Sequence, residues 1–243
     1  PFLQDLNFQF HLCPTKIEEE RKVIPQSIVV IGNKYLKLIN KFYKGLRVTL
    51  GPGIRFKYIH KLNDSLTLKK DYVFVALPIS LKESRYIINT IGNLIEKNKN
   101  HNLNKKWVIK PHPELNFDII INEFKNILEN FKITYDPINI LLQRSSLMIT
   151  NGSTVAFEAM VLGIPVCVIA PKSGFIQNPV PVDLDSIIIQ ICYNEKDVFE
   201  FLQKISTLKK SDKKKLIKIG KKIKTEYFEP VNLKTISSLL QLK

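Results

Sequence analysis

The sequence predicts an α/β protein with a parallel sheet covered by helices on both faces. Three observations lead to this prediction. Apolar runs of strand length alternate with segments of helical periodicity along most of the 243 residues. The apolar runs lack the polar alternation of a half-exposed strand, as expected when both faces of a sheet are covered. A hydrophobic fraction of 44% supplies enough apolar side chains for a sizeable core.

Residues 1–65 are predicted to form a partial N-terminal α/β unit that ends in a linker. An apolar strand at 27–31 is followed by apolar residues with helical spacing and by a second strand at 46–50. A tight turn rich in glycine and proline follows at 51–55. Residues 56–70 are polar and lose periodicity, so we place a domain boundary between residues 65 and 66.

Residues 66–243 are predicted to form the larger domain, a Rossmann-like parallel sheet with helices on both faces. Each expected strand is apolar, and each expected helix carries apolar residues three or four positions apart. Pro137 opens a helical turn, as proline does at a first helical position, and Gly163 ends a helix. The expected strands are 72–77, 107–110, 133–135, 147–150, 165–169 and 186–191. The expected helices are 81–95, 117–131, the turn from 137, 154–162, 195–206 and 211–225.

The net charge of +15 predicts an anionic partner other than nucleic acid. Lysines far outnumber the five arginines, whereas nucleic-acid binders favour arginine and exposed aromatics for phosphate and base contacts. We therefore expect an anionic ligand or an acidic membrane surface. The segment 209–224 holds nine lysines among apolar residues. It is either a solvated surface helix or a peripheral contact with acidic lipid headgroups.

The sequence lacks the signals of several other classes of protein. No apolar run reaches the roughly 20 residues of a transmembrane helix, and we find no signal-peptide pattern. The three cysteines and four histidines lack disulfide or metal-ligand spacing, so we expect no metal site and a cytoplasmic location. The P-loop, G-x-G-x-x-G and G-x-S-x-G motifs are absent. The start at Pro1 looks like a cut edge, so we treat the chain as a fragment.

A stiff, basic turn follows the strand that ends at residue 110. Its sequence is Lys110-Pro111-His112-Pro113. The two prolines hold His112 in an extended turn and remove two backbone donors. A histidine fixed at a strand end can donate to a phosphate or act as a general acid, and Lys110 adds positive charge. The alternative is a plain turn with an exposed histidine.

A second turn follows the strand 147–150 and opens a short helix. Such a turn presents backbone N–H groups and hydroxyls at the positive end of a helix dipole, which favours an anion. Glu158 lies on the helix face of Thr154, where its carboxylate could accept both hydroxyls of a ribose diol. The alternative is that the hydroxyls only cap the helix and Glu158 only faces water. The residues of this turn are Asn151, Gly152, Ser153 and Thr154.

The two turns together resemble the donor-binding half of GT-B glycosyltransferases. A Lys-Pro-His-Pro turn after a strand, then Ser-Thr, Glu-Ala and Gly-x-Pro-Val, is most similar to bacterial surface-polysaccharide enzymes. These include capsule Kdo transferases, sialyl- and polysialyltransferases and, more distantly, teichoic-acid glycerophosphotransferases. In that group an HP motif and a downstream Ser/Thr motif hold the phosphate and ribose of a CMP- or CDP-linked donor. The resemblance covers roughly residues 70–190.

The resemblance implies a role for each residue of the two turns. His112, with Pro113, matches the HP motif and is the expected catalytic residue. Glu158 matches the ribose-side carboxylate. The remaining donor-binding residues are expected to be Lys110, Pro113, Asn151, Gly152, Ser153 and Thr154.

The implied function is metal-independent transfer of a sugar in the biosynthesis of cell-surface polysaccharide such as capsule or lipopolysaccharide. The donor is expected to be a nucleotide sugar, with CMP-linked sugars the first choice, and the acceptor a glycan or a lipid-linked glycan. No separate cofactor is implied. The location is the cytoplasm or the inner face of the cell membrane. The general base of this group comes from the N-terminal domain, most of which this chain lacks, so the fragment need not be active alone.

Two other functions stay open on the sequence. Nucleotide-sugar 2-epimerases share the GT-B fold, an HP near the donor and a Ser-Gly-Gly turn followed by a glutamate, but they need acidic catalytic residues. A non-catalytic module that binds a nucleotide or an anionic glycan is the second.

Overall fold

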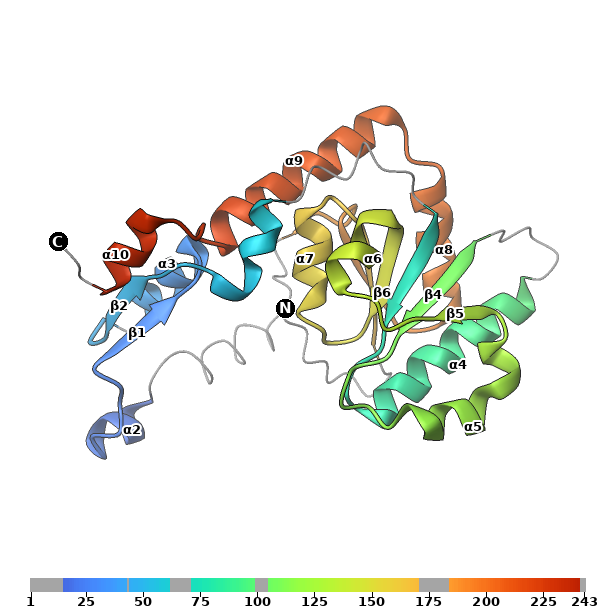
Figure 1. The fold of residues 1–243 in the computed structure, drawn as a ribbon, viewed down its shortest axis with the longest axis horizontal. Helices are drawn as coiled ribbons and strands as arrows, with labels where there is room; N and C mark the ends of the chain where they lie inside the picture. Colours follow the sequence, from blue (N-terminus) through green and yellow to red (C-terminus); the bar gives the residue numbers. More distant parts are fainter. Residues whose placement is uncertain (1–14, 43, 62–70, 99–104, 171–183, 241–243) are drawn as a thin grey trace. The chain divides into compact units, whose positions relative to one another are not determined.

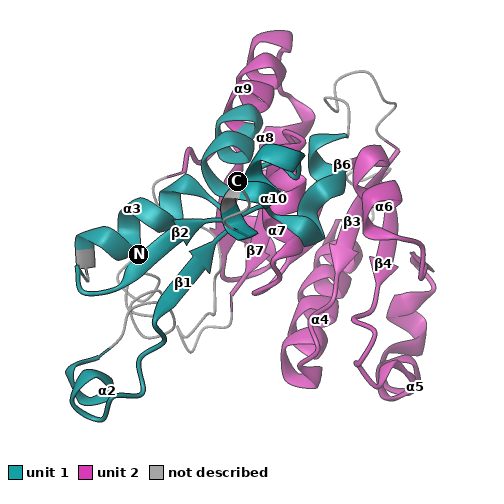
Figure 2. Cartoon of the chain, turned by 60° about the vertical axis from the view of Figure 1, so that its left-hand side comes forward, with its two compact units in different colours: residues 1–62, 220–243 teal, residues 63–219 magenta. Residues whose placement is uncertain are grey.

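The computed structural model describes residues 15–42, 44–61, 71–98, 105–170 and 184–240. The chain divides into two compact units, shown in different colours in Figure 2. Unit 1 comprises residues 1–62 and 220–243, and unit 2 comprises residues 63–219. The expected boundary between 65 and 66 lies outside the described residues. Residues 220–243, which the sequence analysis assigned to the larger domain, group with unit 1.

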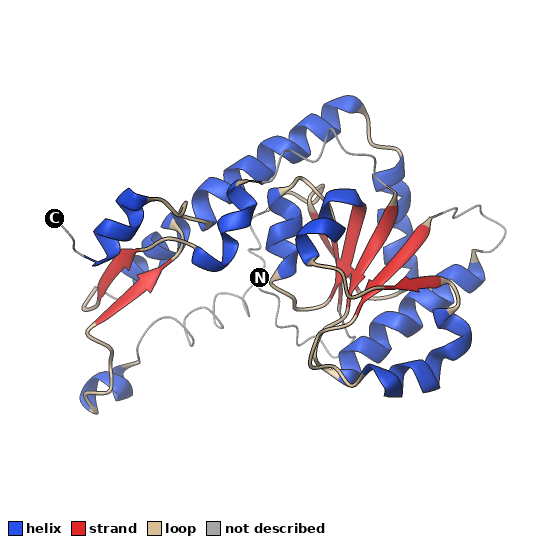
Figure 3. Ribbon diagram, viewed as in Figure 1, coloured by secondary structure: helices blue, strands red, loops and turns tan. Residues whose placement is uncertain are grey.

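Unit 2 is built on a parallel sheet, which confirms the predicted fold class (Figures 1 and 3). The described residues give it six strands, and every neighbouring pair is parallel. The central strand is apolar and wholly buried, as the apolar run YVFVA predicts. In spatial order the strands are β5 (Phe131–Ile133), β4 (Lys106–Lys110), β3 (Tyr72–Ala76), β6 (Ser145–Thr150), β7 (Val166–Ile169) and β8 (Ile189–Cys192).

Helices cover both faces of this sheet (Figure 3). On one face, α4 (Leu81–Lys97), α5 (Phe117–Leu128) and α8 (Glu195–Ser206) pack over alternate residues of the strands and enclose the main apolar core. On the other face lie α6 (Ile138–Arg144) and α7 (Val155–Val161), which contact each other. Helix α6 packs on β3 and β6, and α7 packs on β6 and β7. This double cover explains why the strands carry apolar side chains on both faces.

Unit 1 is a smaller α/β unit. Its strands β1 (Ser27–Val30) and β2 (Arg47–Leu50) pair in parallel, with α3 (Asn33–Phe42) between them in sequence. The other elements within it are the short helix α2 (Lys16–Glu20), the 3-10 helix η1 (Ile54–His60) and α10 (Leu233–Leu240).

The C-terminal residues group with unit 1 because backbone hydrogen bonds join them to its loops. The N–H of Glu229 donates to the carbonyl of Ile31 at 2.6 Å, and the N–H of Gly53 donates to the carbonyl of Glu229 at 3.0 Å. The long helix α9 (Lys210–Tyr227) begins in unit 2 and ends in unit 1. Among the described helices, none combines the length and apolarity needed to cross a bilayer.

Several element boundaries differ from those predicted. Phe131 belongs to β5, where it pairs with Trp107, and does not extend the preceding helix. Residues 54–60 form η1, although the chain was expected to lose regular structure from residue 56. Strand β8 begins three residues later than predicted. The helices α2 and α10 were not predicted, because both are short and α2 buries no side chain.

Helix α7 ends in a motif that requires glycine. Gly163 has a φ of +67°, its N–H donates to the carbonyl of Met160, and the N–H of Ile164 donates to that of Ala159. These are the two hydrogen bonds of a Schellman cap. A Cβ at residue 163 would also lie 3.2 Å from the backbone nitrogen of Ile217.

Replacing Gly163 with alanine is therefore expected to lower the free energy of unfolding by about 1–2 kcal/mol, the cost of a left-handed residue with a Cβ. Urea denaturation followed by the fluorescence of Trp107, the single tryptophan, measures this change within unit 2. The control is Lys213→Ala, which replaces an exposed lysine and is expected to change the free energy of unfolding by less than about 0.5 kcal/mol. Equal stabilities of the two variants would contradict the cap.

Candidate functional site

The carboxyl ends of β4, β3 and β6 form the edge of the sheet at which the order of the strands reverses. The chain runs outward from β3 to β4 and β5, then crosses back to β6 on the other side of β3. In open α/β sheets a ligand binds at such a switch point, outside the carboxyl ends of the strands. Here Ala76 of β3 pairs with Lys110 of β4, and the hydroxyl of Thr150 donates to the carbonyl of Ala76 at 3.0 Å.

This pairing brings the two predicted turns to the same edge. The turn from Lys110 follows β4, and the turn from Asn151 follows β6, with β3 between them. Because neighbouring strands lie 4.7–4.9 Å apart, the ends of β4 and β6 are separated by about 10 Å. That separation is within the length of a nucleotide. The loop after β3 lies between the two turns.

The first turn holds its histidine through hydrogen bonds to the backbone. The imidazole of His112 is exposed, and its Nδ1 accepts from the N–H of Glu114 at 3.2 Å. The carbonyl of His112 accepts from the N–H of Leu115 at 3.0 Å. Because Nδ1 is an acceptor, the neutral ring carries its proton on Nε2. His112 therefore presents an N–H donor from a fixed turn. Lys110 donates its ammonium to the carbonyl of Tyr135 at 3.0 Å, so its charge lies beside the same turn.

The second turn presents backbone donors. Gly152 and Ser153 are partly exposed and Thr154 is exposed. Among the described residues, no acceptor lies within hydrogen-bond distance of the backbone N–H groups of these three residues. Three successive free N–H groups on a turn are suited to an anion. The expectation that both Ser153 and Thr154 cap the helix that follows is only partly correct. The hydroxyl of Ser153 accepts from the N–H of Val155 at 3.3 Å, whereas Thr154 has helical dihedral angles and makes no side-chain cap.

Asn151 is buried at the start of this turn. Its side chain is 1% exposed, and its Nδ2 donates to the carbonyl of Ile169 at 3.0 Å. Its Oδ1 has no hydrogen-bond donor within the described part of the chain. Burying a polar atom without a partner is costly, which makes this oxygen a candidate acceptor for a ligand or a water.

Glu158 does not face water. It is 5% exposed on α7, so the alternative in which its carboxylate is solvated is wrong. A buried carboxylate costs free energy unless it is hydrogen-bonded. Helix α7 therefore buries a carboxylate as well as the apolar side chains that pack on the sheet.

The loop after β3, which includes Ile79 and Ser80, is the third segment of this edge and was not identified from the sequence. Ser80 caps α4, because its hydroxyl accepts from the N–H of Glu83 at 3.3 Å. The signal was available, since Ser-x-x-Glu before an apolar helix is the pattern of a capping box. Next to Ser80, Ile79 is 53% exposed and adds an apolar side chain to an otherwise polar edge.

A cavity of unit 2 lies under α6, between the first residues of β3 and β4 and the residues in and after β5. None of the residues predicted for the site lines this cavity. The described residues include no group of three or more His, Cys, Asp or Glu side chains that could hold a metal ion. The chemistry available at the carboxyl edge is thus hydrogen-bond donation to an anion by backbone N–H groups, an imidazole and an ammonium.

The fold and this edge define a class: the chain has the α/β fold of the GT-B proteins. The S. aureus protein MnaA bound to UDP is similar with a TM-score of 0.60 at 10% identity, over 91% of this chain and 62% of that one. The wall teichoic acid polymerase TagF with CDPG is similar with a TM-score of 0.51 at 15% identity, over 94% and 60%. The UDP-GlcNAc 2-epimerase of Methanocaldococcus jannaschii is similar with a TM-score of 0.51 at 15% identity, over 80% and 60%.

At these identities the likeness establishes the fold, and this chain covers only 60–62% of the length of those three proteins. No curated protein matches the sequence. The chain belongs to the family described as "Protein of unknown function (DUF354)", whose model matches residues 57–229.

The hydroxyl of Thr150 is expected to hold the ends of β6 and β3 together. Thr150→Val keeps the shape of the side chain but leaves the buried carbonyl of Ala76 without this donor, so we expect a loss of about 1–2 kcal/mol in the free energy of unfolding. The matched control is Ser146→Ala. Ser146 donates to the carbonyl of Tyr72 at 2.9 Å, also on β3 but in a partly exposed position where water can replace it. Urea denaturation of both variants tests this, and a smaller loss for Thr150→Val than for Ser146→Ala would refute it.

Proposed function

We propose that this chain is the donor-binding half of a metal-independent glycosyltransferase that uses a nucleotide sugar, with a CMP-linked sugar as donor. The observation that carries the proposal is the placement of the His112 turn and the 151–154 turn on either side of β3, at the switch point of the sheet. Proteins of this fold include structures with UDP and with CDPG, which supports a nucleotide-linked ligand for this fold.

The contacts of the edge support a phosphate between the two turns. The backbone N–H groups of residues 152–154 would donate to one side of the phosphate, and the Nε2–H of His112 would donate to the other. Lys110 would add positive charge without taking part in an ion pair. A single phosphate is small enough for both turns to reach, which favours a CMP-linked donor. The carboxylate of Glu158 would bind the ribose diol.

The proposed reaction breaks the bond between the anomeric carbon and the phosphate oxygen, and the acceptor oxygen takes its place. Negative charge then develops on the departing phosphate, where the N–H groups stabilise it. His112 could also protonate that phosphate, as a general acid does. The acceptor would be a glycan or a lipid-linked glycan in the cytoplasm, as in capsule or lipopolysaccharide biosynthesis. The proton of the acceptor hydroxyl would go to a general base in the N-terminal domain, as the resemblance to GT-B glycosyltransferases implies.

Nucleotide binding tests the proposal. Titration calorimetry with CMP, CDP and UDP is expected to give the tightest binding with CMP. His112→Ala removes the Nε2–H donor, and Ser153→Ala removes a hydroxyl that accepts from Val155 and can donate its own proton to the phosphate. Each is expected to weaken binding by about tenfold, the cost of a charge-assisted hydrogen bond. Thr207→Ala, which removes an exposed hydroxyl at the far end of α8, is the control and is expected to bind like the parent chain.

A further variant separates hydrogen bonding from proton transfer. His112→Gln keeps an N–H donor, so it is expected to recover part of the CMP affinity that His112→Ala loses. Tighter binding of UDP, together with interconversion of UDP-linked sugar epimers, would favour the 2-epimerase alternative. CMP binding without transfer by a longer form of the protein would favour a non-catalytic module. Failure of all three nucleotides to bind would end the proposal.

We also propose that α9 makes peripheral contact with an acidic membrane surface. Its apolar residues Leu216 and Ile223 are buried, whereas lysines such as Lys213, Lys214 and Lys218 are exposed. The apolar side chains of α9 are therefore packed inside the protein, and attraction to the membrane surface would come from the lysines alone.

Flotation with vesicles of phosphatidylcholine and phosphatidylglycerol tests this contact. We expect retention at low ionic strength that falls as salt is added, because the attraction is screened within a Debye length. Replacing Lys213, Lys214 and Lys218 by glutamine should abolish it, and equal retention of the variant would contradict a role for α9.

A further inference from the structure

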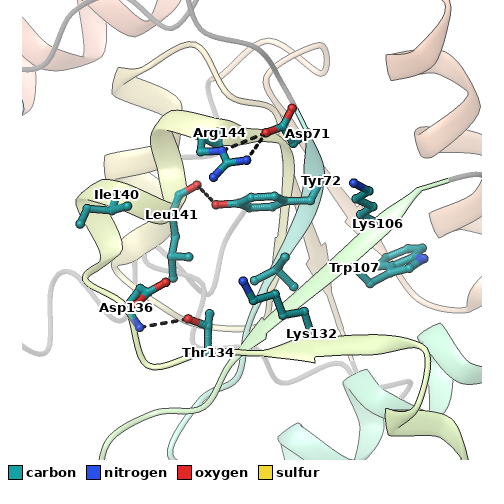
Figure 4. Close-up of a pocket in the computed structure, with 11 residues that line it drawn as sticks. Asp71, Tyr72, Lys106, Trp107, Lys132, Thr134, Asp136, Ile140, Leu141 and Arg144 are labelled. Carbon is teal, nitrogen blue, oxygen red and sulfur yellow. Dashed lines mark hydrogen bonds and ion pairs between the residues drawn. The ribbon is translucent and has the colours of Figure 1, made fainter.

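Unit 2 contains a cavity that the proposed function does not use. Its volume is about 370 Å³, and it lies under α6, between the amino ends of β3 and β4 and the residues from Lys132 to Asp136 in and after β5 (Figure 4). Tyr72 and Lys106 are the first residues of their strands, whereas the donor edge begins after the last residues of the same strands. On β5 the cavity instead reaches Thr134 and Asp136, which follow the end of that strand, so it lies under α6 beside the donor edge without including any of the residues predicted for that edge.

One wall of the cavity is fixed by hydrogen bonds. The hydroxyl of Tyr72 donates to the carbonyl of Leu141 at 2.8 Å, and burial raises the pKa of this phenol. Arg144 is paired with Asp71 through its side chain, and the N–H of Asp71 donates to the carbonyl of Arg144 at 2.9 Å. The guanidinium of Arg144 lies 6.0 Å from the centre of the Tyr72 ring. This wall is thus already in place before any ligand binds, which lowers the entropic cost of binding.

The opposite side of the cavity carries two lysines without partners. Lys106 and Lys132 form no ion pair or hydrogen bond with any residue that the structure describes. The register of β4 and β5 pairs Val108 with Lys132, so the two lysines stand on the same face of adjacent strands, two residues out of step. Both lysines are exposed, and long side chains in such diagonal positions are within reach of a common anion.

A buried hydroxyl supplies a third donor. Thr134 is 7% exposed, and its oxygen accepts from the N–H of Asp136 at 3.2 Å. Its own proton has no acceptor among the described residues. Around these donors, Val108, Leu141 and the ring of Tyr72 give the cavity an apolar lining. Five of the eleven lining residues are charged, so the cavity combines apolar side chains with converging polar groups, as small-molecule sites do.

We propose that this cavity binds a small organic anion, a single ring that carries a phosphate or carboxylate group. The anionic group lies between Lys106 and Lys132 and accepts from Thr134, and the ring lies against Tyr72 and Leu141. The volume is near the lower end of the range for ligand sites, which suits one ring and excludes a nucleotide sugar. This site is separate from the donor edge and does not depend on the proposed function.

Phenyl phosphate is the probe that tests this site. Titrated into the full ¹⁵N-labelled chain, it is expected to shift the amide signals of Tyr72, Lys132 and Thr134. Lys106→Gln and Lys132→Gln should each weaken binding by about tenfold. Lys125→Gln, an exposed lysine on α5, is the control and should leave the affinity unchanged within a factor of two. Inorganic phosphate, which lacks the ring, should bind more weakly than phenyl phosphate.

One variant is expected to change affinity in the opposite direction. Asp136→Asn removes a negative charge at the rim but keeps the N–H that bonds Thr134, so it should strengthen binding severalfold, which a damaged fold could not do. No binding, shifts confined to residues 112 and 151–154, equal affinity of the lysine variants and the parent chain, or inorganic phosphate binding as tightly as phenyl phosphate would each overturn the proposal.

Discussion

The arrangement of unit 2 depends on the pairing of β3 on both of its sides. All five of its residues are buried, and it pairs in parallel with β4 on one side and β6 on the other. Because a parallel neighbour is reached only through a crossover, the chain must pass over one face of the sheet to form β4 and β5 and over the other to form β6 and β7. This single constraint creates the switch point, sets the two helical layers and places the turns after β4 and β6 on one edge.

Much of this fold could be predicted because its strands are apolar on both faces and its helices are periodic. The run from Tyr72 to Ala76 is short and rich in aromatic and β-branched residues, which favours a buried strand. The errors arose where local pattern and tertiary pairing disagreed. Phe131 continues the apolar spacing of the helix before it, but pairing with Trp107 places it in a strand. The grouping of residues 220–243 with unit 1 depends on hydrogen bonds between Glu229 and both Ile31 and Gly53, which are far from it in sequence and leave no local signal.

The placement of the two candidate turns at one edge of the sheet could also be predicted from local sequence patterns. The two turns are recognisable in the sequence by their proline, glycine and hydroxyl-bearing residues, because the effects of these residues on the backbone are local. The burial of Asn151 and Glu158 is set by what packs around them, so the sequence suggested a solvated alternative for Glu158 that the structure excludes. The cavity under α6 could not be predicted at all. Its walls come from Tyr72, Lys106, Lys132 and Leu141, which carry no shared motif and meet only because three strands and one helix converge.

Strand β5 has a further consequence for the behaviour of the protein at high concentration. It is the outermost described strand on its side of the sheet, it has only three residues, and Lys132 is exposed at its centre. A bare strand edge invites the strands of another molecule, and a charged side chain on a short edge discourages that pairing. The ammonium group that faces the cavity thus also helps to keep one molecule's sheet from being extended by the next.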